Sequence, residues 1–231
     1  MSHHHQKGRN MKRILYSGNR NASSWAFRAW LALKEQGIPF EERIIDIRRP
    51  QRWENLQHIG TFSPPAAVPV LDDDGLIIFD SLAIAEYASE LGEGSLWPED
   101  IGARAKARSF AAWQHSTFGR VCSALSFESA FYPDKKALSQ DETAQIEAIY
   151  QLWNDTINEY GGQYLVGEFS IADIMLLPSV VRFSSHLEAD ERWPYTQRWF
   201  SELLNRPYVR EWLDEASQQE PIYLPGYRND P

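Results

Sequence analysis

The chain has 231 residues, which is enough for one large domain or two small ones. Hydrophobic residues make up 43% of the chain and aromatic residues 13%, and this composition excludes a disordered protein. The formal net charge of −9 disfavours nucleic-acid binding, which would need a dense basic patch. The nearest approach to such a patch is Arg48, Arg49 and Arg52, which is interpreted as a solvated loop.

Cysteine use and the absence of long apolar runs predict a cytoplasmic protein. The one cysteine, Cys122, cannot form an internal disulfide and lies in an apolar helical pattern typical of a buried structural thiol. No apolar run approaches the roughly 18 residues of a membrane span. Residues 1–10, MSHHHQKGRN, lack a signal-peptide core and are interpreted as tag or linker, so their histidines are given no metal role.

The first elements predict a β-α-β unit. RILY at 13–16 favours a strand, and the next segment favours a helix that is capped by Ser23 or Ser24 and ends before Gly37. FEERIIDI at 40–47 favours a second strand. A connecting helix of this length implies parallel pairing with a right-handed crossover. The segment 48–65 is weakly patterned and contains at most one short helix.

A hairpin and a third helix follow. Two apolar runs, 68–71 and 76–79, are joined by DDDG, in which Gly75 can supply a positive φ. Asp80 and Ser81 suit the cap of the helix LAIAEYASEL. Residues 11–91 therefore predict an α/β fold with a mixed four-strand sheet and helices on its faces.

The rest of the chain favours helices only. GEGSLWP is a connector rich in Gly and Pro, so residues 92–102 are assigned as linker between a domain at 11–91 and an all-helical domain at 103–231. Capping boxes begin two of the helices, and a proline lies inside the second of these. The predicted helical segments are Ala103 to about Glu128, Ser139 to Tyr160, one opened by Ser170-x-x-Asp173 and containing Pro178, and one or two between Pro194 and Ala216.

Two sites in the first domain could hold an extended ligand. A cis Val68-Pro69 bond would let the Val68 backbone pair with a peptide as an extra strand, although an ordinary trans proline is favoured from the dipeptide alone. Asp80-Ser81 would offer a helix N-terminus to a carboxylate and the Asp80 carboxylate to an ammonium group. Taken alone, a simple N-cap is the favoured interpretation of this pair.

A third site lies where the first strand becomes the first helix. Asn21, Ser23 and Ser24 stand in this turn. A hydroxyl at a helix N-terminus could donate a hydrogen bond to a thiolate and lower a thiol pKa from about 8.5 toward neutral. Helix capping is the alternative, and one serine can cap while the other stays free.

The order of these three features resembles the thioredoxin-like N-terminal domain of cytosolic glutathione transferases. In the second half, SIAD resembles the N-capping motif of that family's helical domain, and SLWPED resembles its connector. The segment NASSWAFRAWLALKEQGIPFEE is similar to zeta-like and related bacterial groups that use serine rather than tyrosine. The likeness covers Met11 to about Ala216.

The resemblance implies roles for particular residues. Ser23 would stabilise the glutathione thiolate, with Ser24 and Asn21 as alternatives. Val68, followed by a cis Pro69, would bind the cysteinyl backbone. The γ-glutamyl end would be bound by Asp80 and Ser81.

One departure from the family concerns the glycyl carboxylate. Family members often carry a basic or amide residue just before Val-Pro, where this chain has Ala66 and Ala67. Arg52 or His58 is then expected to bind the carboxylate, or glutathione binds weakly. The first turn has no cysteine, so the thiol–disulfide exchange of some relatives is not expected.

The helical domain would supply the electrophile pocket, from Trp113, His115 and Phe118. A helix presents only one side, so these three cannot all face the cleft, and core packing is favoured for either aromatic residue. The implied function is a homodimeric detoxification enzyme that uses glutathione as co-substrate against a small hydrophobic electrophile. A zeta-like isomerase is a variant, and a non-catalytic glutathione-binding or regulatory protein is the alternative. A serine hydrolase is disfavoured, because no G-x-S-x-G is present.

Overall fold

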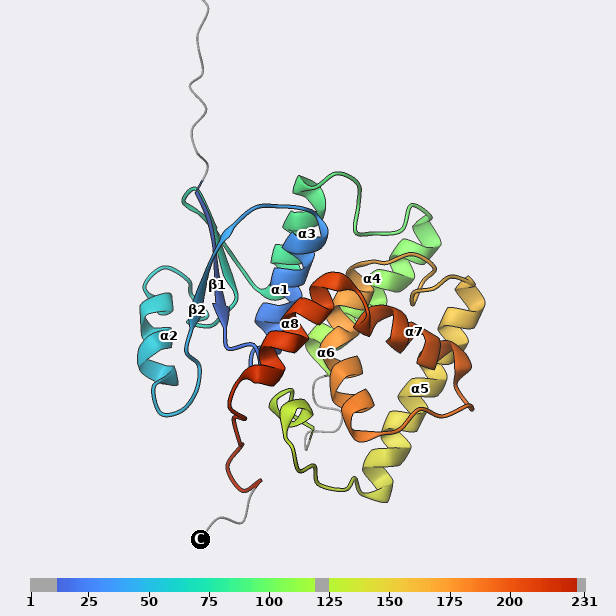
Figure 1. Ribbon diagram of the computed structural model, residues 1–231. Helices are drawn as coiled ribbons and strands as arrows, with labels where there is room; N and C mark the ends of the chain where they lie inside the picture. Colours follow the sequence, from blue (N-terminus) through green and yellow to red (C-terminus); the bar gives the residue numbers. More distant parts are fainter. Residues whose placement is uncertain (1–11, 119–124, 228–231) are drawn as a thin grey trace, which may run out of the picture.

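A computed structural model describes residues 12–118 and 125–227 of the chain, so the prediction for Cys122 lies outside the described residues. A sheet with α2 on one side lies next to a larger group of helices (Figure 1). The elements, in chain order, are β1 (Arg13–Gly18), α1 (Ser24–Glu35), β2 (Glu41–Ile45), α2 (Arg52–Gly60), β3 (Val70–Asp73), β4 (Leu76–Phe79), α3 (Ser81–Leu91), α4 (Ile101–Ser116), the 3₁₀ turn η2 (Glu128–Phe131), α5 (Gln140–Tyr160), α6 (Ile171–His186), α7 (Pro194–Leu204) and α8 (Pro207–Gln218).

The sheet confirms the predicted mixed topology. Its strand order is β2-β1-β3-β4. Strand β1 runs parallel to β2 and antiparallel to β3, and β3 and β4 form the hairpin. The hairpin turn places Asp74 at φ +53° and Gly75 at φ +96°. Glycine has no Cβ to clash in this left-handed region, which explains the turn at Asp-Gly.

The alternation of side chains along β1 divides the packing into two layers. Ile14 and Tyr16 pack on one face with Ile59 of α2. Leu15 points to the opposite face and is fully buried in the large core that includes α1 and α3. Figure 1 shows α2 on one side of the sheet and α1 and α3 on the other. The period-two pattern of a strand thus places helices on both faces.

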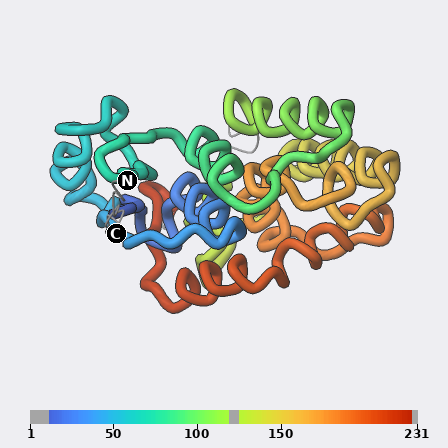
Figure 2. The backbone as a smooth tube through the Cα atoms, turned by 90° about the horizontal axis from the view of Figure 1, so that it is seen from above, coloured from blue at the N-terminus to red at the C-terminus, as the bar shows by residue number. Residues whose placement is uncertain are grey.

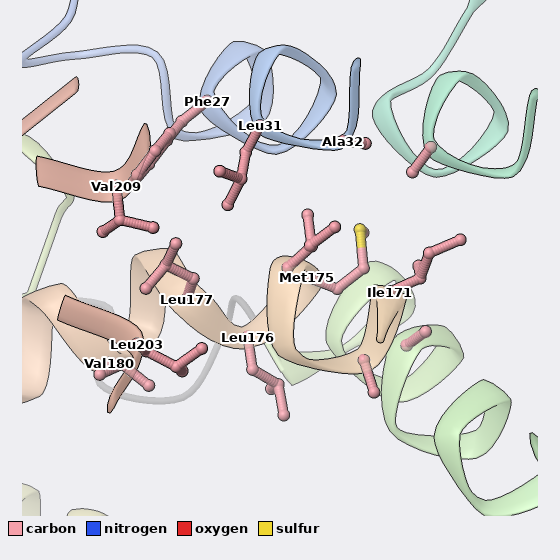
Figure 3. Packing of buried hydrophobic residues seen from close by; sticks show 14 of the residues in the cluster. Phe27, Leu31, Ala32, Ile171, Met175, Leu176, Leu177, Val180, Leu203 and Val209 are labelled. Carbon is pink, nitrogen blue, oxygen red and sulfur yellow. The ribbon is translucent and has the colours of Figure 1, made fainter. Parts of the chain in front are cut away.

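Helix α1 links the sheet to the helical part. Seen from above, α1 and α3 lie between the sheet and α4 to α7 (Figure 2). Figure 3 shows Phe27 and Leu31 of α1 facing Leu177 of α6, with Val209 of α8 beside them. Arg28 of α1 is also buried, and its Nε donates a hydrogen bond to the carbonyl of Met175 on α6 at 2.8 Å. One hydrophobic cluster therefore spans both parts of the chain.

The local helix signals are confirmed. Ser139 and Glu142 form a capping box at the start of α5, and Gly161 follows that helix in the left-handed conformation. The Ser170–Asp173 box begins α6, which contains Pro178. Helix α4 is shorter than predicted, because Thr117 leaves helical geometry at φ −132°. Within the described ranges, no helix combines the length and the apolar character that crossing a bilayer requires.

Candidate functional site

A pocket of about 400 Å³ opens where the loop before β3, the start of α3 and the end of α4 meet. Five of the sequence-predicted site residues and Trp25 contribute to its wall. The lining residues are Trp25, Pro65, Ala67, Val68, Pro69, Phe79, Asp80, Ser81 and His115. A pocket of this size with a mostly apolar wall and a few convergent polar groups is typical of a small-molecule site.

One wall of the pocket is the segment that leads into β3. The Val68-Pro69 peptide bond is cis, as the family resemblance implied and unlike the trans bond favoured from the dipeptide alone. The pairing of β3 with β1 and β4 begins at Val70. Val68 thus lies outside this ladder, at the pocket, where its backbone could pair with an extended ligand.

The N-terminus of α3 forms the polar end of the pocket. Asp80 is the N-cap, and its Oδ1 accepts a hydrogen bond from the Leu82 N–H at 2.8 Å. Its backbone has φ +79° and ψ 131°, a region in which a residue with a Cβ is strained by about 1–3 kcal/mol. The adjacent Ser81 is buried, and its Oγ has no hydrogen-bond partner. Strained backbone and unpaired polar atoms together are typical of ligand sites.

His115 of α4 reaches this polar end from the helical part. Its Nε2 lies 2.8 Å from Asp80 Oδ2, and its Nδ1 is buried without a hydrogen-bond partner. The indole of Trp25 stands edge-on to the imidazole, with 5.6 Å between ring centres. Beneath Trp25, the Arg28 guanidinium lies 4.3 Å from the ring centre. Burial lowers the pKa of Arg28, and nearby Asp80 opposes that shift.

The turn between β1 and α1 carries the three candidates for the thiol. Ser23 is 4% exposed and is the N-cap of α1, accepting from the Ala26 N–H at 3.3 Å. A Cβ at Gly18 would lie 2.6 Å from the Ser23 Cβ, so glycine leaves the room that Ser23 occupies. Ser24, the first residue of α1, is partly exposed.

Asn21 is turned toward the C-terminal segment. Its Nδ2 donates to the Glu220 carbonyl at 2.8 Å, and its N–H donates to Gln219 Oε1 at 3.2 Å. The side-chain oxygen of Asn21 is buried without a partner. None of Asn21, Ser23 and Ser24 lines the first pocket, although Trp25, the next residue, does.

A second pocket, of about 390 Å³, adjoins the same turn through Ala22. Arginines of the β2–α2 connection form one wall, and the segment after α8 forms an apolar wall. The full lining is Ala22, Ile47, Arg48, Arg49, Arg52, Glu128, Glu220, Pro221, Ile222, Tyr223, Leu224 and Pro225. Burial raises the pKa of the Glu128 carboxyl, while the charge of Arg52 opposes the shift.

The remaining predicted residues lie elsewhere. His58 is exposed on α2, with its ring edge-on to Phe62 at 5.8 Å. Phe118 is buried and packs against Trp153 and Trp113. Neither Trp113 nor Phe118 lines the first pocket. Among the described residues, no cluster of His, Cys, Asp and Glu has the makings of a metal site.

Sequence reasoning did not single out Trp25 or Arg28 as site residues. Trp25 follows the helical spacing of α1, yet it is 40% exposed at the pocket. Arg28, one turn later, is buried beneath it. An arginine on the apolar face of a predicted buried helix is the signal that could have drawn attention to this pair.

Comparison with known proteins finds similar sequences along most of the chain. Residues 22–91 match the family model described as glutathione S-transferase, N-terminal domain. The chain is 31% identical to maleylacetoacetate isomerase of Mus musculus over 172 residues, covering 73% of this chain and 77% of that protein. It is 27% identical to glutathione S-transferase GstB of Escherichia coli over 203 residues, covering 83% and 94% of the two chains.

Solved structures with a similar fold carry the same family name. A crystal structure of a glutathione transferase homologue from Drosophila mojavensis, with bound glutathione, superposes with a TM-score of 0.71 at 22% sequence identity. The alignment covers 90% of this chain and 94% of that structure. Because the sequence identity is only 22%, this likeness supports the fold alone: a thioredoxin-like domain followed by helices.

Proposed function

The chain belongs to the glutathione transferase family, and on this premise we propose that it binds glutathione beside the β1–α1 turn and activates its thiol for attack on a small hydrophobic electrophile. The thioredoxin-like domain, 11–91, would bind glutathione, and the helical domain, 103–231, would carry the electrophile site. The enzyme would lower the thiol pKa and hold the two reactants close together.

The observation that carries the proposal is the shared pocket of Val68-Pro69 and Asp80-Ser81. An extended tripeptide spans about 10 Å, so it can bind Val68 with its middle residue and reach α3 with its γ-glutamyl end. There the Asp80 carboxylate would bind the α-ammonium group of the γ-glutamyl residue. The α-carboxylate would be bound by the α3 N-terminus and the unpaired Ser81 Oγ.

The other groups of glutathione would lie toward the second pocket. Ser23, or else Ser24 or Asn21, would donate to the thiolate, with the α1 N-terminus favouring the anion. Arg52 is our first choice for the glycyl carboxylate, because it lines the second pocket and its Nε is buried without a hydrogen-bond partner. His58 is the alternative. Arg52 would then do the work of the basic or amide residue that family members often carry just before Val-Pro, where this chain has Ala66 and Ala67.

The electrophile would enter from the helical side. We propose that it contacts His115, which lines the first pocket. Trp113 and Phe118, which pack against each other, would contribute behind this wall. Ile222 and Leu224 add apolar surface in the second pocket. The likeness to maleylacetoacetate isomerase favours an isomerase variant, in which glutathione adds to a conjugated double bond, the bond rotates and glutathione leaves.

We further propose a homodimer that acts in the cytoplasm on electrophiles to be detoxified. These proposals follow the family expectation and the single cysteine. The non-catalytic alternative rests on Ala66 and Ala67 and predicts glutathione binding without thiolate formation.

The thiol of bound glutathione is expected to ionise well below the free value of about 8.5. The measurement is thiolate absorbance in the ultraviolet with purified protein across a pH range, with S-methylglutathione as the matched blank. Binding without an ionisation shift would support the non-catalytic alternative. Absence of binding at millimolar glutathione would overturn the proposed function.

Replacing Asp80 by asparagine is expected to weaken glutathione binding about tenfold to a hundredfold. The amide can still cap α3 but cannot neutralise an ammonium group, and losing a charge-assisted hydrogen bond corresponds to this range. Calorimetric titration measures the dissociation constant. The matched control is Asp100→Asn, at the N-cap of α4, which lies outside the pocket lining and should keep wild-type affinity. Equal affinities of wild type and Asp80→Asn would contradict the assigned role.

A further inference from the structure

The chain after α8 forms one wall of the second pocket without belonging to any helix or strand. Residues 219–227, which we call the C-terminal segment, have no regular secondary structure. Glu220 to Pro225 of this segment nevertheless line the second pocket together with the arginines of the β2–α2 connection. A segment that lacks a ladder of backbone hydrogen bonds depends on other contacts for a fixed position. The residues that supply these contacts therefore set the shape of the pocket.

The C-terminal segment is first attached at the turn that carries the thiol candidates. Asn21 of this turn donates from its N–H to Gln219 Oε1 at 3.2 Å and from Nδ2 to the Glu220 carbonyl at 2.8 Å. Ala22, the next residue, lines the second pocket. A substituent on a sulfur atom bound at this turn would therefore lie beside the C-terminal segment.

The second attachment is the hydroxyl group of Tyr132, just after η2. It donates a hydrogen bond to the Ile222 carbonyl at 2.7 Å and accepts one from the Leu224 N–H at 2.9 Å. Tyr132 is 1% exposed, and its ring packs against Tyr223 and Tyr227, with 4.6 and 4.4 Å between ring centres. Burial raises the pKa of Tyr132, so the hydroxyl keeps the proton that it donates. One buried hydroxyl thus holds the backbone on both sides of Tyr223.

The side chains held in this way are apolar and belong to the wall of the pocket. Ile222 and Leu224 are both partly exposed, and both line the second pocket. Loss of the Tyr132 hydroxyl would leave the Ile222 carbonyl and the Leu224 N–H to bind water instead. The wall could then move away from a bound apolar group, although the buried ring itself would be kept.

We infer that Tyr132 is a specificity-determining residue, which holds Ile222 and Leu224 in place and so makes the site favour electrophiles with an extended apolar chain. The inference rests on the proposed function, because it takes the β1–α1 turn as the place where the sulfur binds. Tyr132 lines neither of the two pockets. It acts as a positioning residue through the C-terminal segment.

The test compares two glutathione derivatives without a free thiol, S-methylglutathione and S-hexylglutathione. Only the length of the alkyl chain on the sulfur differs, so the ratio of their dissociation constants isolates the contribution of the apolar wall. Burial of one methylene group strengthens binding up to about fourfold. Because a flexible chain is only partly buried, the wild-type protein is expected to bind S-hexylglutathione about tenfold to a hundredfold more tightly than S-methylglutathione.

Tyr132→Phe keeps the ring and removes both hydrogen bonds to the C-terminal segment. It should lower the preference for the hexyl derivative by about threefold or more, while the affinity for S-methylglutathione changes by less than about twofold. Hydrogen exchange at the Leu224 amide should become faster at the same time. Tyr150→Phe is the matched control, because Tyr150 is equally buried but lies on α5 outside the lining of both pockets. It should keep the wild-type ratio and the wild-type exchange.

Replacing Ile222 by alanine shows whether Tyr132 acts through the wall. Ile222→Ala should lower the same preference about threefold to tenfold, and adding Tyr132→Phe should cause little further loss, because both changes affect one contact. An unchanged ratio in Tyr132→Phe, losses that multiply in the double variant, or equal affinities of the two derivatives in the wild type would each overturn the inference. Binding of S-methylglutathione in these cases would leave the proposed glutathione site standing. If neither derivative binds, the proposed function fails and the inference fails with it.

Discussion

Replacing Asp173 by alanine is expected to lower the free energy of unfolding by about 3–5 kcal/mol. The carboxylate is fully buried and accepts hydrogen bonds from the Ser170 N–H at 2.8 Å, the Leu165 N–H at 3.1 Å and the Trp199 indole N–H at 2.7 Å. Alanine would leave all three donors buried without an acceptor. It would also remove the capping box that begins α6, the helix on which α1 packs.

The measurement is urea unfolding followed by tryptophan fluorescence. The matched control is Glu142→Ala, which removes the same position of the capping box of α5, where the hydrogen bonds are exposed. The Glu142→Ala variant should lower the free energy of unfolding by about 1 kcal/mol or less. Equal losses in the two variants would mean that burial adds nothing to the Asp173 network.

The difference in stability between wild type and Asp173→Ala should also depend on pH. Burial raises the pKa of Asp173 to about 6, against the hydrogen bonds that lower it. The folded state then binds this proton more tightly than the unfolded chain, whose aspartates titrate near 3.9. The contribution of Asp173 to stability should therefore shrink as the pH rises from about 4 to about 6. A difference between wild type and Asp173→Ala that stays constant over this window would contradict the shift.

Features that depend on near neighbours in the chain were predictable from the sequence. Ser139 and Glu142 are three residues apart, as are Ser170 and Asp173, so a capping box can be recognised directly. The Asp-Gly turn and the cap at Asp80 are equally local. The parallel pairing of β1 and β2 followed from the length of the connecting helix.

Features that depend on tertiary contact were not predictable in this way. His115 and Asp80 are 35 positions apart, and only the tertiary fold brings the end of α4 to the start of α3. Asn21 was a candidate for the thiol, yet the chain after α8 provides its hydrogen-bond partners. No local pattern in either segment indicates such a partner.

The Val68-Pro69 bond shows what a family resemblance adds to local reasoning. A trans bond is the more frequent state of any X-Pro pair, so the dipeptide alone favoured trans. The order of motifs around it resembled a family in which this bond is cis, and the structure has it cis. The distinguishing information lay in the order of three motifs along the chain, from Ser23 to Ser81.

Replacing Ser23 by alanine is expected to lower turnover about a hundredfold while glutathione affinity changes less than about threefold. A hydroxyl that donates to a developing thiolate acts mainly on the reacting anion, and losing one such donor has this magnitude. Steady-state kinetics with a general electrophile, together with calorimetric titration of glutathione, separate the two effects. The hydroxyl of Ser23 also caps α1, so some loss of stability, about 1 kcal/mol, should accompany the variant.

Two controls assign the effect to chemistry. Ser139→Ala removes the cap of α5, far along the chain from the thiol candidates, and should lower stability by a similar amount without affecting turnover. Ser24→Ala changes the next hydroxyl in the same turn, which is partly exposed and caps nothing. Normal turnover in Ser23→Ala with a large loss in Ser24→Ala would move the thiol contact by one residue along α1. Normal turnover in both would leave Asn21 as the remaining candidate, and its replacement by alanine would be the deciding variant.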